Sequence, residues 1–136
     1  METPRGRNLL FGVEDVAAGN GELVRKADGL FAAMSRGKGR QEIRGIMEFL
    51  NAFAALHFAR EERYMTEYGY PDSRLHKEEH DCFAGSCSYL KNEVEANGAS
   101  TFLVLKAGRL LFDWITHHVG RADRALCEFL KSRADE

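Results

Sequence analysis

Residues 57–80, HFAREERYMTEYGYPDSRLHKEEH, hold two pairs of potential metal ligands on either side of a Gly-Tyr-Pro break. His57 and Glu61 are four residues apart before the break, and His76 and His80 are four residues apart after it. Side chains four residues apart lie one above the other on the same face of an α-helix. Each pair can therefore direct two donor atoms at one point. The stretch predicts two helices that meet at a shared metal site.

A third set of donors lies further on, in WITHHVGRAD at residues 114–123. His118 and Asp123 are five residues apart, which is about 140° around an ideal helix. The two side chains reach one site only if the helical turn widens, as in a π-bulge, and Gly120 between them permits such a turn. Imidazole suits iron, copper and zinc, and carboxylates can bridge two ions. We therefore predict a site for one or two first-row transition metals.

The candidate ligands all fall on the predicted inward faces of helices. They are His57, Glu61, His76, His80, His118 and Asp123. A single histidine on an apolar face is usually a core residue with a hydrogen-bond partner. Two buried carboxylates without partners, however, would each cost on the order of several kcal/mol. A bound cation would remove this free-energy cost and would explain why all six side chains face inward. Zinc or manganese could occupy the same donors as iron.

Apolar residues recur at three- and four-residue steps through most of the chain, the pattern of amphipathic helices. We predict bundle helices at residues 15–36, 41–68, 72–96 and 100–119, and a short closing helix at 122–133. Connections of a few residues make successive helices antiparallel. The fold class is thus all-α, an up-down-up-down antiparallel four-helix bundle in a single domain, 1–136. Pro4, Gly6 and Gly12 predict that residues 1–14 form an extended N-terminal arm.

The composition excludes several classes of partner. The 136 residues are 44% apolar and 29% charged, with a formal net charge of −2, which is globular composition without long-range attraction for nucleic acid or anionic membranes. No segment approaches the roughly 18 to 20 apolar residues of a membrane span, and the start has no signal-peptide pattern. We expect a cytoplasmic protein with no nucleic-acid or membrane partner. The sequence does not identify a protein partner.

With these motifs the chain resembles bacterial hemerythrins over nearly its whole length. The resemblance rests on HFAREERYM, GYPDSRLHKEEHD and WITHHVGRAD, and on the combined spacings HxxxE, HxxxH and HxxxxD. It implies a non-heme, oxo- or hydroxo-bridged di-iron centre that binds dioxygen reversibly. One iron would take His76, His80 and His118, and the second would take His57. Glu61 and Asp123 would bridge the two ions.

One position departs from the hemerythrin pattern. Hemerythrins carry a further histidine in the first helix, and alignment on Leu23 and Met34 places Asn20 at that position. No other histidine precedes His57, so the second iron would lose one of its two imidazoles. Asn20 could offer its side-chain oxygen, a water could fill the position, or His117 could turn toward the metal. The position of His117, about 100° around the helix from His118, is more typical of a surface or supporting residue.

The resemblance also indicates which residues surround the bound ligand. Trp114 and Ile115 match positions that pack on the iron and line the dioxygen pocket in hemerythrins, and Phe58 and Tyr64 are further candidates. The second iron would have fewer imidazole ligands and an exchangeable coordination position. We therefore predict weaker binding of that iron and fast autoxidation. Such a centre suits oxygen sensing as well as storage or transport.

Three functions remain open at this point. The first is a hemerythrin-like protein that binds dioxygen at a modified di-iron site. The second is a di-iron enzyme that reacts with dioxygen, peroxide or nitric oxide, although no catalytic base or substrate pocket can be named. The third is a signalling or interaction module in which the metal stabilises the bundle.

Overall fold

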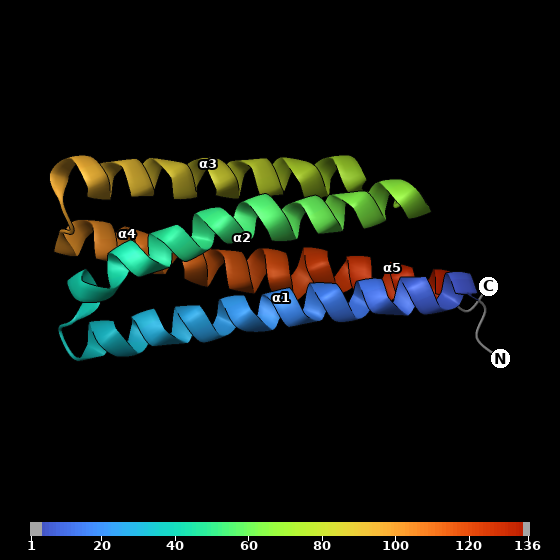
Figure 1. Ribbon diagram of the computed structural model, residues 1–136, viewed down its shortest axis with the longest axis horizontal. Helices are drawn as coiled ribbons and strands as arrows, with labels where there is room; N and C mark the ends of the chain where they lie inside the picture. Colours follow the sequence, from blue (N-terminus) through green and yellow to red (C-terminus); the bar gives the residue numbers. More distant parts are fainter. Residues whose placement is uncertain (1–3, 135–136) are drawn as a thin grey trace.

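Four long helical rods lie side by side in the computed structural model, which describes residues 4–134 (Figure 1). In chain order the segments are α1 (Pro4–Ser35), α2 (Gly39–Tyr68), α3 (Ser73–Asn97), α4 (Thr101–Asp113), a π-helix (Trp114–Asp123) and α5 (Arg124–Ala134). Connections at alternating ends of the bundle make successive rods antiparallel (Figure 1). The prediction of an all-α four-helix bundle is confirmed.

Short turns with defined chemistry separate the rods. Gly37 and Gly69 have φ angles of 71° and 68°. Residues with a Cβ atom rarely adopt positive φ angles, whereas glycine does so readily. The N–H of Gly69 donates to the Met65 carbonyl and so closes the last turn of α2. At the start of α4 the Ser100 hydroxyl accepts a hydrogen bond of 3.1 Å from the Leu103 N–H and so caps the helix.

The N-terminal segment differs from the prediction. Residues 4–14 form the first turns of α1 and not an extended arm; residues 1–3 of that arm lie outside the described residues. Proline is tolerated in the first turn of a helix, as at Pro4, because its missing N–H has no intrahelical partner there. Gly12 lets the Tyr64 ring approach, 3.2 Å from the place a Cβ would occupy. With Leu9 fully buried, packing against the end of the chain extends α1 and overrides the weak local propensity.

The predicted break between residues 119 and 122 is also absent. α4, the π-helix and α5 follow one another without a gap from Thr101 to Ala134. The wider π-turn keeps Gly120 inside the helix, where glycine costs only about 1 kcal/mol. The end of this rod runs along the start of α1, so both termini lie at one end of the bundle (Figure 1).

The buried polar residues form a layer between two apolar clusters. The larger cluster draws on α1, α2, α3 and α4 and on Trp114 at the start of the π-helix. The smaller one consists of Leu9, Met65, Tyr68, Tyr70, Leu126 and Leu130. On α2, His57 and Glu61 fall between Phe53 of the larger cluster and Met65 of the smaller one. Within residues 4–134 no helix has both the length and the apolar composition to cross a bilayer.

Candidate metal centre

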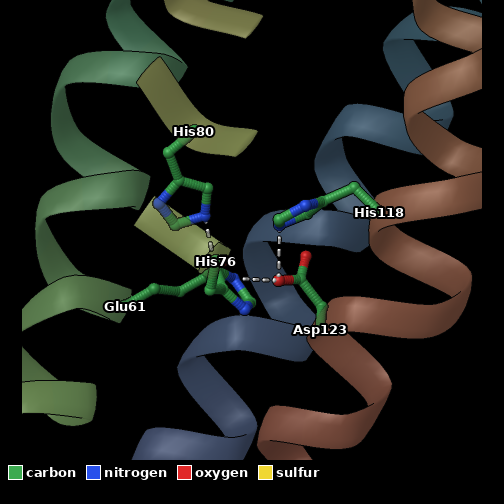
Figure 2. Close-up of side chains that lie close together, drawn as sticks. All are labelled: Glu61, His76, His80, His118 and Asp123. Carbon is green, nitrogen blue, oxygen red and sulfur yellow. Dashed lines mark hydrogen bonds and ion pairs between the residues drawn. The ribbon is translucent and has the colours of Figure 1, made fainter. Parts of the chain in front are cut away.

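Five donor side chains from three rods converge in the polar layer (Figure 2). They are Glu61 on α2, His76 and His80 on α3, and His118 and Asp123 in the π-helix. One ligand atom of each lies within 4.8 Å of the others, and none of the five residues is more than 3% exposed. The structure thus brings together five of the six predicted ligands.

The π-helix allows one segment to contribute both His118 and Asp123. Its hydrogen bonds join residues five apart, so residues five apart lie near one another on the same face. His118 Nε2 is 3.0 Å from Asp123 Oδ1. The widened turn that the spacing required is therefore present, and it extends over the 10 residues Trp114–Asp123.

Three histidines and one oxygen from each carboxylate define the first potential metal position, called position 1 here. Glu61 Oε1 lies 2.9 Å from His76 Nε2 and 3.3 Å from His80 Nε2. Asp123 Oδ1 lies 3.0 Å from the Nε2 atoms of both His76 and His118. Position 1 therefore offers three imidazole nitrogens and two carboxylate oxygens.

The other oxygens of the same two carboxylates face a second potential position, position 2. Glu61 Oε2 lies 2.6 Å from Nε2 of His57, the sixth predicted ligand. Asp123 Oδ2 accepts a hydrogen bond of 2.9 Å from Asn20 Nδ2. Gly19 makes room for His57, because a Cβ at residue 19 would overlap the imidazole ring. Position 2 thus has one imidazole, and Asn20 contacts the site by holding a carboxylate oxygen.

Several buried polar atoms in this layer have no hydrogen-bond partner within the described part of the chain. These are Nε2 of His57, His80 and His118, Oε2 of Glu61, Oδ1 of Asp123 and Oδ1 of Asn20. A buried polar atom left unsatisfied costs about 1–3 kcal/mol. Lone pairs that face one another in this way are satisfied by a cation, and imidazole with carboxylate is a donor set for first-row transition metals. The residues present fit a metal centre.

Comparison with known proteins agrees with this geometry. The family model described as "Hemerythrin HHE cation binding domain" matches residues 12–130, which include every donor from Asn20 to Asp123. The chain belongs to the hemerythrin family. It is also similar to the bacteriohemerythrin of Methylococcus capsulatus, with 32% identity over 85 residues. That alignment covers 62% of this chain and 63% of the relative, so it spans less than two-thirds of the relative's length.

Aromatic rings stack on three of the histidines in this hemerythrin domain. The pairs, with centroid separations and interplanar angles, are Phe53–His57 (4.5 Å, 16°), Phe58–His80 (3.9 Å, 2°) and Trp114–His118 (3.8 Å, 8°). Stacked rings restrict the imidazole planes and keep water from the ligand atoms. Phe53 was not predicted, although it precedes His57 by four residues and so shares its helix face.

The remaining predicted residues have different surroundings. Ile115 is half-buried against the larger apolar cluster. Tyr64 donates a 2.6 Å hydrogen bond to Asp15 and packs on the smaller cluster; burial and the Asp15 carboxylate raise its pKa to about 12. His117 is exposed in a surface cleft beside Arg121. The structure brings neither Tyr64 nor His117 into the donor cluster.

Sequence reasoning missed two carboxylates that contact the donors from outside. Glu62 lies 2.9 Å from His80 Nδ1 and Glu79 lies 2.8 Å from His118 Nδ1. Each is adjacent in sequence to a donor, Glu62 to Glu61 and Glu79 to His80. That adjacency was the available signal, but it does not separate them from the many acidic residues on solvated helix faces.

Without metal, the cluster is held by interactions between the histidines and the carboxylates. Burial raises the pKa of Glu61, but the imidazoles of His57, His76 and His80 close to its oxygens outweigh burial and hold the pKa well below the ordinary 4.5. Burial lowers the pKa of His76, while the nearby carboxylates of Asp123 and Glu61 raise it, and the balance is about 9. Metal-free protein therefore keeps His76 protonated and Glu61 ionised at neutral pH.

The metal-free protein should be most stable between about pH 4.5 and 6.5. The stabilisation from His76 is complete below its unfolded pKa of 6.5 and is lost as the pH rises through about 9, a loss of about 3 kcal/mol. The stabilisation from Glu61 is present above 4.5 and is lost as the pH falls through its lowered pKa. Urea unfolding in the presence of a chelator, at pH values from 4 to 9, measures this profile.

Metal-loaded protein provides the control for that profile. Metal ions bind histidine only when it is deprotonated, so acid releases the metal and higher pH favours it. The stability of the loaded protein should therefore rise between about pH 5 and 7. A metal-free protein as stable at pH 9 as at pH 6 would contradict the assigned pairing of His76.

Proposed function

We propose that this hemerythrin-family protein is a non-heme di-iron protein that binds dioxygen or a related small ligand, with a modified and more open second iron site. The observation that supports this most is the division of the two carboxylates. Glu61 and Asp123 each direct one oxygen to position 1 and the other to position 2. A carboxylate used in this way joins two ions. Position 1 would take His76, His80 and His118, and position 2 would take His57.

When bound, the iron pair supplies redox chemistry and an exchangeable coordination position for a diatomic ligand. The protein holds the donors and controls their surroundings. Phe58 and Trp114 stack on His80 and His118 and shield their ligand atoms. Asn20 fixes the far oxygen of Asp123 through its amide N–H.

The single imidazole at position 2 carries the proposed modification. Of the three ways to compensate for the missing histidine, inward rotation of His117 has the least support, because His117 is exposed outside the cluster. The Asn20 oxygen is buried and has no hydrogen-bond partner in residues 4–134, so it or a water is available to position 2. Both are weaker donors than imidazole, which favours a labile second ion and fast autoxidation. A sensing role follows more readily than long-term storage.

The other two functions stay predictions, as does a cytoplasmic location. An enzyme that reacts with dioxygen, peroxide or nitric oxide would consume a reductant continuously. A signalling module would need the metal only for stability, so its partner binding would survive replacement of iron by zinc.

The decisive test is metal content together with the optical spectrum of anaerobically reduced protein before and after exposure to air. Two irons per chain and a charge-transfer band that bleaches under vacuum would establish reversible dioxygen binding. Immediate conversion to the diferric form would support the reactive or sensing centre. A crystal structure in which the chain supplies a full set of ligands to the second iron would contradict the open site.

A further inference from the structure

Two carboxylates outside the donor cluster contact the histidines of position 1. Glu62 on α2 reaches across to His80 on α3, and Glu79 on α3 reaches across to His118 in the π-helix. An ionised carboxylate can only accept a hydrogen bond, so the Nδ1 atoms must be the donors. With Nδ1 protonated, Nε2 carries the free lone pair and faces the interior. Each contact therefore selects the tautomer that can bind a metal.

The two contacts connect neighbouring rods, and both histidines are 1% exposed. Glu62 is 27% exposed and Glu79 is 52% exposed at the side chain. Each carboxylate thus keeps part of its hydration while it accepts a hydrogen bond from a buried ring. This arrangement lets the negative charge act on the imidazole without the full cost of burying it.

Position 2 has no such support in the described residues. The Nδ1 side of His57 lies against the backbone of α1 at Gly19, and within residues 4–134 its carboxylate contact is with Glu61 on the Nε2 side. Its ring is held by stacking on Phe53. The two positions therefore differ in the number of histidines and in the charge behind them.

We propose that Glu62 and Glu79 are positioning residues that make position 1 the tighter metal position, so that this hemerythrin domain fills position 1 before position 2 and passes through a stable one-metal form. This inference rests on the proposed metal centre and goes beyond it. A carboxylate behind a histidine ligand fixes the ring and increases its basicity, and loss of such a partner typically costs 10- to 100-fold in metal affinity.

Anaerobic titration with Fe²⁺ against a competing chelator tests the order of loading. The wild type should bind two ions in two resolved steps. Glu62→Gln and Glu79→Gln should each weaken the first step by about 10- to 100-fold and leave the second within about threefold. Glu78→Gln is the matched control, because Glu78 adjoins Glu79 in sequence but pairs with Arg74 on the surface; it should titrate like the wild type.

A spectroscopic measurement separates positioning from a general effect on folding. In the Zn²⁺-loaded protein, the Nδ1 proton of His118 should resonate far downfield because it is bonded to a carboxylate. Glu79→Gln should move that signal upfield and leave the signal of His80 in place, whereas Glu62→Gln should do the reverse. A merely structural role would move both signals together or neither.

The outcomes distinguish this inference from the proposed function. A wild type that binds no iron would overturn the proposed metal centre and this inference with it. A wild type that binds two ions, with Glu62→Gln and Glu79→Gln both titrating like Glu78→Gln, would overturn this inference alone. Two steps of equal affinity in the wild type would also overturn it.

Discussion

Replacement of Glu61 by glutamine is expected to lower metal affinity at both positions by more than about 100-fold. This loss is larger than the loss of affinity of about 10- to 100-fold that is typical when a residue hydrogen-bonded to a metal ligand is removed. Glu61 is fully buried, and its two oxygens face His57 on one side and His76 and His80 on the other. Glutamine keeps the volume but removes the charge and turns one oxygen into an N–H donor. Metal content after dialysis and chelator competition measure the loss.

The fold should survive this change. The two apolar clusters lie on either side of the polar layer, so the helical content of Glu61→Gln should match that of the wild type. Glu67→Gln is the control, because it removes the same charge from an exposed position of α2. It should bind metal like the wild type. Retention of two tightly bound ions by Glu61→Gln would show that Glu61 does not bridge the positions.

The donor cluster could be predicted because helical spacing fixes which side chains share a face. The four-residue pairs in α2 and α3 required no knowledge of the third dimension beyond the period of the helix. The five-residue pair of His118 and Asp123 required a widened turn, and the π-helix provides it. These predictions depend on local geometry, which sequence specifies well.

The parts that failed depend on contacts between rods. Pro4 and Gly12 have low helix propensity, yet α1 begins at Pro4 because the start of the rod packs on α5. Gly12 serves close packing with Tyr64 instead of breaking the helix. Tertiary burial overrides propensity at such positions, and the burial comes from Tyr64 on α2 and from α5, which lie far along the chain.

The supporting carboxylates were missed for a related reason. Glu62 and Glu79 lie toward the solvent side of their own helices, and their value comes from a histidine on the next rod. No spacing within one helix identifies such a pair. Asn20 was found because the hemerythrin pattern has a histidine at its position, and in the structure this buried amide donates a hydrogen bond to Asp123.

Replacement of Asn20 by histidine should strengthen binding of the second metal by at least about tenfold and slow oxidation of the reduced protein by air. Asn20 is 8% exposed and its amide reaches Asp123 at position 2, so an imidazole at this residue would add a second nitrogen donor to that of His57. Two imidazoles donate more charge and leave fewer exchangeable positions. The affinity of the second step and the rate of the optical change in air measure the two effects.

Asn20→Ala separates the new donor from the lost hydrogen bond. It removes the contact with Asp123 without adding a ligand, so it should weaken the second step or leave it unchanged. The histidine is larger than asparagine, and overpacking of about 1–3 kcal/mol should appear as lower stability of metal-free Asn20→His. That cost should be offset when metal binds, because ligand binding stabilises the folded state in proportion to its affinity. If Asn20→His and Asn20→Ala hold the second ion equally, residue 20 does not govern position 2, and the open character of this site must come from His57 alone.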